Sequence, residues 1–158
     1  MKMNSITPCL WFDTQAEEAM KYYVSVFPNS KMGHVTHYGE GMHMPKGTVL
    51  TATATLNGQD FMGLNGGPQA KFSEAVSFMV NCDTQDEIDT LWEKLTADGG
   101  KPVQCGWLTD KYGLSWQIVP SVLWDLMKDA RRFDRVMHAV MGMVKLDIKE
   151  LQQAYDSA

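Results

Sequence analysis

The chain has 158 residues, of which 44% are hydrophobic and 21% are charged, and its formal net charge is -5. This length fits one domain or two small modules that share a core, and the hydrophobic content is enough to bury one. The negative charge, with no basic cluster larger than Arg131-Arg132, excludes nucleic acid as an expected partner.

The chain also lacks features of membrane and secreted proteins. No apolar stretch approaches the ~18 residues that a membrane span needs, and Met1–Ser5 leads directly toward a short strand, so we expect a cytoplasmic protein with no membrane partner. The three cysteines, Cys9, Cys82 and Cys105, form no C-x-x-C pair, which argues against a disulfide framework and a zinc knuckle. We interpret all three as small buried hydrophobic residues.

The first part of the chain predicts strands around a single helix. The expected elements are strands over 6–12, 31–38, 49–56 and 59–64 and an amphipathic helix over 16–26. Pro28 ends the helix, and Asn57-Gly58 is a strong hairpin pattern between the last two strands. The glycine-punctuated loop from Gly39 to Gly47 has no counterpart later in the chain, so we interpret it as an insertion and a candidate lid.

The same order of elements is predicted a second time. The expected elements are strands over 75–82, 102–108 and 114–119 and a helix over 86–97. From Val122 onward an apolar stripe at helical spacing predicts helix only, and Asp147-Ile148-Lys149-Glu150 has the residue types of a capping box that opens a last short helix. We expect this tail to pack on the sheets or on a second subunit.

A local repeat supports the duplication. Asp13-Thr14-Gln15 recurs as Asp83-Thr84-Gln85, and a glutamate, Glu17 or Glu87, follows each copy two residues later. Because both copies stand between a strand and a helix, we interpret them as helix caps. The sequence thus predicts an α+β fold in which residues 1–120 form paired βαβββ modules, about 5–67 and 74–120, with a helical tail over 121–158.

Three segments carry a resemblance to a known family. They are Leu10–Asp13, Tyr22–Lys31 and, most specifically, Gly106–Pro120. In these segments the chain resembles the PhnB-like branch of the vicinal oxygen chelate superfamily, which includes glyoxalases, bleomycin-resistance proteins and extradiol dioxygenases. The resemblance implies two βαβββ modules whose curled mixed sheets surround a shared cavity, commonly in a homodimer.

In metal-dependent members, the resemblance implies one ligand from the first strand and one from the last strand of each module. The corresponding positions here hold Ile6–Pro8, Val76-Ser77, Met62–Leu64 and Gln117, and only Gln117 is a suitable donor. A divalent metal needs three or four protein donors, so we expect no metal and no other cofactor. His34, His37 and His43 lie close in sequence, but His34 and His37 would point to opposite faces of a strand.

The predicted ligand pocket combines aromatic and scattered polar side chains on or beside the strands. Its residues are Cys9, Trp11, Phe61, Asn65, Ser77, Phe78, Trp107, Trp116 and Gln117. A plain hydrophobic core has the same composition, so both interpretations stay open. No Ser-His-Asp, Cys-His or paired-carboxylate set falls on these strands, and catalytic residues cannot be named.

These observations favour a small-molecule-binding protein of the superfamily, without metal and without an assignable catalytic activity. The first alternative is a metal-dependent lyase, isomerase or dioxygenase that uses Gln117 with histidines from the loop. The second is a methyltransferase, as a label inherited in the PhnB-like branch implies. We interpret the glycine-rich segment Gly63–Gly67 as a linker and not as a methyl-donor loop, because Pro68 and the residues after it do not open a helix.

Overall fold

The computed structural model describes residues 6–157, and backbone contacts divide the chain into two compact units, Met1–Lys71 and Phe72–Ala158. Met1–Ser5, expected to lead into the first strand, lies outside the described residues. None of the helices in the described range has the length and apolar character needed to cross a membrane.

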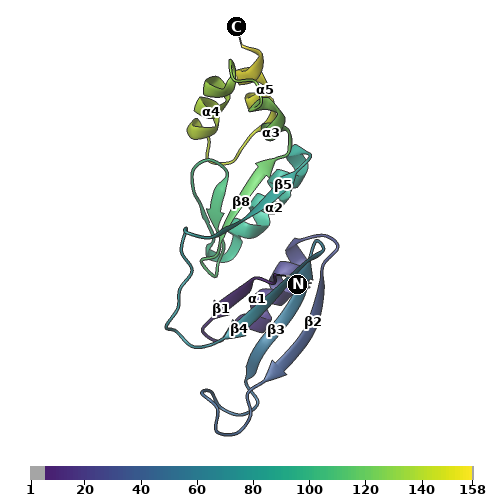
Figure 1. The fold of residues 1–158 in the computed structure, drawn as a ribbon, viewed down its shortest axis with the longest axis vertical. Helices are drawn as coiled ribbons and strands as arrows, with labels where there is room; N and C mark the ends of the chain where they lie inside the picture. The colour runs from purple at the N-terminus through teal and green to yellow at the C-terminus, as the bar shows by residue number, and fades with distance from the viewer. Residues whose placement is uncertain (1–5, 158) are drawn as a thin grey trace, which may run out of the picture. The chain divides into compact units, whose positions relative to one another are not determined.

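The first unit is a four-stranded mixed sheet with one helix across one face (Figure 1). Its elements are β1 (Cys9–Phe12), α1 (Ala16–Val26), β2 (Lys31–His37), β3 (Val49–Leu56) and β4 (Gln59–Asn65). The strand order is β1-β4-β3-β2, with β1 parallel to β4 and the other pairs antiparallel. Asn57 and Gly58 both have positive φ, 44° and 85°, so the predicted two-residue hairpin is confirmed.

The second unit repeats this arrangement and adds the tail. Its sheet elements are β5 (Ser77–Cys82), α2 (Gln85–Thr96), a short 3-10 turn η1 (Ala97–Gly99), β6 (Lys101–Pro102), β7 (Trp107–Thr109) and β8 (Ser115–Pro120). The strand order β5-β8-β7-β6 matches that of the first sheet position by position, again with the outer and second strands parallel. The predicted α+β class with two βαβββ modules is confirmed.

Each sheet has a helix-covered face and an opposite face. On β8, Trp116 and Ile118 are 3% and 0% exposed, and they share the α2 side with Leu108 of β7, which is 0% exposed. The alternate residues, such as Trp107 and Gln117, pair across the strands on the opposite face. Burial of the helix-facing apolar side chains fixes the register, because a slip of one residue would turn them outward.

The strand predicted over 102–108 is wrong, since β6 and β7 are separated by residues 103–106. Cys105 and Gly106 have φ angles of 61° and 81°, which no strand residue adopts. Their backbone N–H groups leave the sheet and donate to the carbonyls of Met143 and Val144, both at 2.8 Å. Cys105 and Gly106 thus form the turn of a hairpin between the antiparallel strands β6 and β7, in which Trp107 N donates to the Gln104 carbonyl at 3.1 Å.

The tail consists of three helices, α3 (Val122–Leu126), α4 (Phe133–Gly142) and α5 (Ile148–Asp156). Their apolar stripe packs into its own cluster together with the end of β8. Its buried members are Val119, Leu123, Leu126, Val136, Val140, Leu146 and Leu151. Part of the predicted stripe stays at the surface, since Met141 and Val144 are 58% and 42% exposed.

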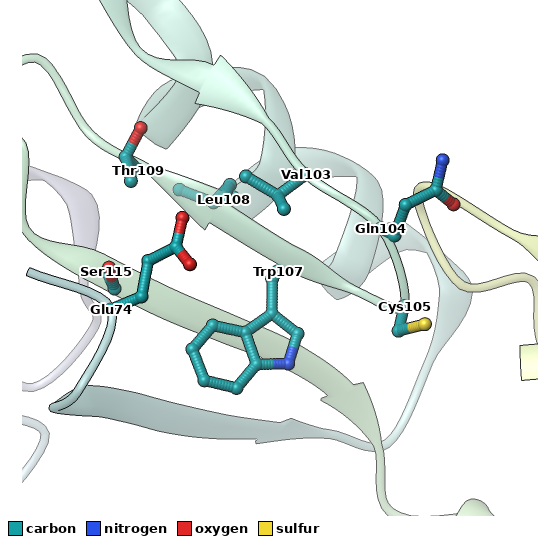
Figure 2. A pocket seen from close by; sticks show the side chains of 8 residues that line it. All are labelled: Glu74, Val103, Gln104, Cys105, Trp107, Leu108, Thr109 and Ser115. Carbon is teal, nitrogen blue, oxygen red and sulfur yellow. The ribbon is translucent and has the colours of Figure 1, made fainter. Parts of the chain in front are cut away.

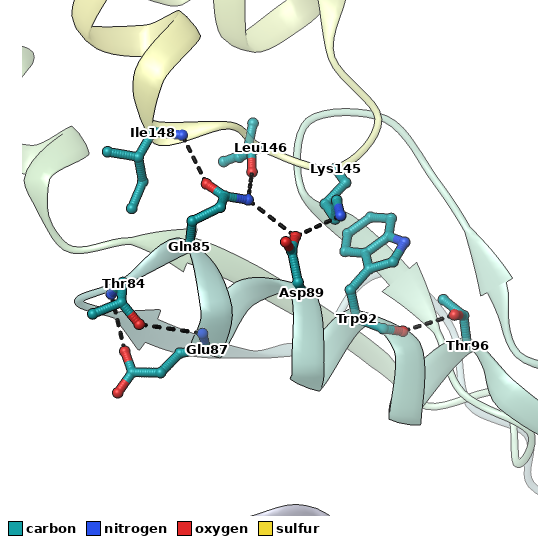
Figure 3. Close-up of polar contacts among 9 residues, drawn as sticks. All are labelled: Thr84, Gln85, Glu87, Asp89, Trp92, Thr96, Lys145, Leu146 and Ile148. Carbon is teal, nitrogen blue, oxygen red and sulfur yellow. Dashed lines mark hydrogen bonds and ion pairs between the residues drawn. The ribbon is translucent and has the colours of Figure 1, made fainter.

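Gln85 of α2 holds the tail through both ends of its side-chain amide (Figure 3). Its Nε2 donates to the carbonyl of Leu146 at 3.2 Å, and its Oε1 accepts from the backbone N–H of Ile148 at 2.9 Å. Lys145 pairs with Asp89 one turn further along α2. The ammonium of Lys145, and next the amide of Gln85, hold the pKa of Asp89 below its ordinary value.

The two predicted helix caps differ from each other in the structure. Thr84 forms a full capping box with Glu87, as predicted, and Asp147 caps α5 by accepting from Glu150 N at 2.9 Å. The cap predicted for α1 is wrong, because the N-cap residue is Gln15 and its side chain accepts no hydrogen bond from the first helical turn. Asn65, at the end of β4, accepts from the N–H of Ala16 at 2.8 Å instead.

Candidate functional site

The opposite face of the second sheet gathers a mixed set of aromatic and polar side chains. Trp107 and Gln117 are direct partners across β7 and β8, and Thr109 and Ser115 form the next pair on the same face. Gln117 Nε2 donates to Ser77 Oγ of β5 at 2.9 Å, which links the third strand to the group. Strand alternation sends these side chains away from α2.

A pocket of about 310 Å³ opens beside this face (Figure 2). Its lining residues are Glu74, Val103, Gln104, Cys105, Trp107, Leu108, Thr109 and Ser115. Figure 2 shows the indole of Trp107 extending from β7 on the side away from Val103 and Leu108. The volume lies at the lower end of the range of ligand pockets, about 300–1,000 Å³, so the pocket suits a small molecule.

The pocket wall contains a buried hydroxyl that has no hydrogen-bond partner. Ser115 is 1% exposed, and its Oγ is unpaired among the described residues. A buried hydroxyl without a hydrogen-bond partner costs about 1–3 kcal/mol of free energy. A ligand that supplies a partner recovers that free energy. Among the lining residues Glu74 alone carries a charged side chain, and it is exposed.

Asp110 holds the β7–β8 hairpin that carries these side chains. Its carboxylate is 2% exposed and accepts from the backbone N–H groups of Tyr112 at 2.9 Å and Leu114 at 3.1 Å. The other carboxylate oxygen accepts from Trp116 Nε1 at 2.8 Å. Because Trp107 precedes Asp110 and Ser115 follows it, these bonds set the separation of the two strands at the pocket.

The predicted pocket residues of the first unit lie on two different faces of its sheet. Cys9 and Trp11 lie on the opposite face, where Trp11 is 38% exposed and donates from Nε1 to the Gly67 carbonyl at 2.8 Å. Phe61 and Asn65 lie on the helix-covered face and are 6% and 3% exposed. Asn65 also donates to the Val49 carbonyl at 3.0 Å, so its amide ties the sheet to α1.

The second unit divides its predicted residues in the same way. Ser77, Trp107 and Gln117 lie together on the opposite face. Phe78 and Trp116 lie on the helix-covered face, with ring centroids 5.6 Å apart and planes inclined at 48°. Of the predicted residues, Trp107 alone lines the pocket, and the wider set stays a prediction.

Sequence reasoning missed Glu74, Thr109, Ser115 and the buried Asp110. Ser115 lies two residues from Gln117, and Thr109 lies two residues from Trp107. Strand alternation therefore predicts that all four side chains share one face. Glu74 precedes β5 in an irregular segment, and no periodicity places such a residue. Asp110 lies between two predicted strands, in a connection where a carboxylate is ordinarily solvated.

The donor groups of the described residues do not assemble into a metal site. Within 6–157, no three His, Cys, Asp or Glu side chains lie close enough together to share an ion. His34, His37 and His43 are exposed on β2 and the loop after it. Gln117, the sole donor expected at a ligand position, hydrogen bonds to Ser77.

The cysteines differ from the prediction that all three are buried. Cys82 is buried, whereas Cys9 is exposed and Cys105 is half-buried at the pocket. Burial, reinforced by the charges of Glu87 and Asp83, raises the pKa of the Cys82 thiol to about 11. Partial burial also raises the pKa of Cys9, so neither thiol has the lowered pKa of a nucleophile.

Comparison with known proteins gives one family and a set of solved structures. The model of the family described as 3-demethylubiquinone-9 3-methyltransferase matches residues 4–119. A putative 3-demethylubiquinone-9 3-methyltransferase, PhnB protein, from Bacillus cereus is 39% identical, with a TM-score of 0.68 over 75% of this chain and 100% of that one. No curated protein gives a significant match.

Two more distant structures share the fold. Protein PA1353 from Pseudomonas aeruginosa is 18% identical, with a TM-score of 0.63 over 75% of this chain and 98% of its own. The fosfomycin resistance protein FosX from Listeria monocytogenes, in a complex with Mn(II) and sulfate, is 12% identical, with a TM-score of 0.54 over 81% of this chain and 98% of its own. The family match ends where the tail begins, at the last residues of β8.

Proposed function

The chain belongs to the 3-demethylubiquinone-9 3-methyltransferase family, the PhnB-like branch of the vicinal oxygen chelate superfamily, and we propose that it is a small-molecule-binding protein that uses neither a metal nor a catalytic step. The observation that carries the proposal is the pocket against Trp107. It joins an indole, a dry unpaired hydroxyl and a volume suited to a small ligand.

The chemistry of the residues around the pocket supports binding more than turnover. A nucleophile or general base needs a partner within hydrogen-bond reach that shifts its pKa or orients it. Ser115 has no such partner, and the nearest strand neighbours supply an indole, a threonine hydroxyl and an amide. None of these side chains is a general base, and the one carboxylate of the lining, Glu74, is exposed.

The family description contains the word methyltransferase, and the fold offers a physical test of it. Methyl-donor and nucleotide loops of the glycine-rich type connect a strand to a helix within a parallel sheet. Gly63–Gly67 runs out of β4 into an irregular segment, and the next helix of the described chain is α2 at Gln85. S-adenosylmethionine at millimolar concentration should therefore give no saturable heat of binding.

Metal-dependent chemistry is the other alternative, because FosX from Listeria monocytogenes was crystallised with Mn(II). The donor set of the described residues does not fit such an ion, since Gln117 hydrogen bonds to Ser77 and no acidic or histidine cluster accompanies it. Addition of manganese, nickel or zinc should leave the melting temperature unchanged.

The proposal is tested by screening a library of small aromatic and aliphatic compounds by calorimetry against the full-length protein and the Trp107→Ala variant. Trp124→Ala is the matched control, because Trp124 is 43% exposed on α3 and does not line the pocket. We expect saturable binding to the wild type and the control, and loss of binding in Trp107→Ala. Equal binding by all three proteins, or no binding to any, would refute the proposal.

Three further expectations belong to the proposal. The first is a homodimer, which the resemblance implies and which exposed apolar side chains on the tail, among them Trp124 and Met141, support. The second is cytoplasmic residence. The third is a lid made by Gly39–Gly47, whose base is closed by two backbone hydrogen bonds between Tyr38 and residues 47–48. Sedimentation velocity tests the dimer, and glycine-to-alanine changes at the loop test the lid through the rate of ligand release.

A further inference from the structure

The charge and donor pattern of the pocket indicates the chemical class of its ligand. We propose that the pocket against Trp107 takes a small apolar amine in its protonated form, with the ammonium group between Glu74 and the Trp107 indole. This inference rests on the proposed binding function and narrows it to one class of ligand.

The electrostatic part of the argument begins with the lining residues. Glu74 supplies a carboxylate, and no lysine, arginine or histidine lines the pocket. An anionic ligand would therefore meet a like charge without a compensating cation, whereas an ammonium group gains an ion pair. The net charge of -5 acts in the same direction, because it raises the local concentration of cations around the whole protein.

The indole adds a second attraction for the same group. Trp107 is half-buried and extends into the pocket, so its ring is available as a wall (Figure 2). An ammonium over an indole face is attracted by the ring quadrupole, and indole is the strongest of the aromatic side chains in this respect. Val103 and Leu108 add apolar surface to the lining, which suits a hydrocarbon body.

The hydroxyls provide hydrogen-bond acceptors for the N–H groups. An ammonium has three donors, and Glu74 uses one or two of them. Ser115 Oγ is buried, lies in the pocket wall and has no partner, and Thr109 contributes a second hydroxyl on the same face. These hydroxyls can accept from the N–H groups of an ammonium, whereas a carboxylate ligand would meet Glu74 as a like charge.

The test uses three probes of one shape that differ in charge: benzylammonium, benzyl alcohol and benzoate, each titrated by calorimetry into the full-length protein. We expect benzylammonium to bind about tenfold more tightly than benzyl alcohol, a difference that one ion pair of modest strength supplies, and benzoate to bind more weakly than either. Ser115→Ala should reduce the affinity for benzylammonium more than that for benzyl alcohol.

The matched pair of variants is Glu74→Gln and Glu93→Gln. Both remove one negative charge, but Glu93 lies exposed on α2 and does not line the pocket. Glu74→Gln should remove the preference for benzylammonium, and Glu93→Gln should keep it. Equal losses in the two variants would show a general field effect and overturn the assignment.

Failure of this inference is distinguishable from failure of the proposed function. If benzyl alcohol binds as tightly as benzylammonium, or if library compounds bind through Trp107 while benzylammonium does not, the amine assignment is wrong and the binding function stands. If neither the library nor the three probes bind, both fall together.

Discussion

Asp110 allows the sharpest test of how the fold presents its pocket. Its carboxylate accepts three hydrogen bonds inside the β7–β8 hairpin, from Tyr112, Leu114 and Trp116. Asp110→Ala removes the acceptor atoms of all three hydrogen bonds at once. Leu114 and Trp116 are 2% and 3% exposed, so the N–H groups that lose their acceptor there stay buried and cannot hydrogen bond to water. Tyr112 is half-buried, so its N–H can hydrogen bond to water after the change.

The expected loss of stability follows from the two N–H donors that stay buried. A buried donor that loses a charged acceptor costs about 1.5–3 kcal/mol, and removal of the carboxylate's own desolvation penalty offsets part of the total. We expect Asp110→Ala to lower the free energy of unfolding by about 3 kcal/mol, and Asp110→Asn by about half as much because the amide keeps one acceptor oxygen.

The assay is urea unfolding followed by circular dichroism and tryptophan fluorescence, with Asp86→Ala as the control. Asp86 is an exposed aspartate in the first turn of α2 in the same unit, so its loss should change stability by less than about 0.5 kcal/mol. If the free energy of unfolding of Asp110→Ala is lower than that of the wild type by less than about 1 kcal/mol, with an unchanged m-value, the carboxylate does not hold the hairpin and the reasoning is refuted.

Three further predictions follow from the caps, the tail and the buried thiol. Thr84→Ala should cost about 1 kcal/mol of stability and Thr14→Ala much less, since Thr84 caps α2 and Thr14 caps no helix; equal costs would contradict this. Gln85→Ala should cost about 1–3 kcal/mol and speed amide exchange at Ile148, and unchanged exchange there would show that the tail is held elsewhere. Because the folded pKa of Cys82, about 11, exceeds its ordinary value of 9.0, its contribution to stability is complete below pH 9 and is lost as the pH rises toward 11. A Cys82→Ala variant should lose that alkaline slope, and a slope equal to that of wild type would exclude Cys82 as its source.

Periodicity predicted most of the fold because both sheets bury one face under a helix. The alternation of β3 and the helical spacing in α1 follow directly from that burial, and the bounds of α1 and β3 match the expectation residue for residue. The same reasoning failed at 103–106, where Cys105 and Gly106 form a two-residue turn that reverses the chain between β6 and β7. Cys-Gly is a weaker turn pattern than Asn57-Gly58, because cysteine, unlike asparagine, is not enriched at positive φ.

The candidate site was harder to predict because aromatic residues occur on both faces of a sheet. Composition placed Trp107 and Trp116 together in one pocket, yet the structure separates them by strand alternation. Trp116 packs under α2 against Phe78, and Trp107 points away from the helix. Strand alternation alone predicts that Trp107 and Ser115 share one face of the sheet and that Trp116 lies on the other.

The two modules differ most in how they treat the hydroxyls on their opposite faces. In the first sheet the threonines of β3 are satisfied internally: Thr51 bonds to Thr36 at 2.7 Å, Thr53 accepts from His34 N at 2.8 Å, and Thr55 donates to Asp60 at 2.7 Å. In the second sheet Ser115 is left without a partner.

A face whose hydroxyls are already paired gains nothing from a polar ligand, because each new hydrogen bond would replace an existing one. A face with a buried, unpaired hydroxyl gains one additional hydrogen bond from such a ligand. The duplicated scaffold therefore accounts for the helix-covered faces, which are alike in both modules, whereas the unpaired buried hydroxyl found among the described residues lies in the second module. Substitution of Ser115 by alanine removes that gain and should leave the fold intact, since alanine fills the same space in β8 without a hydroxyl to satisfy.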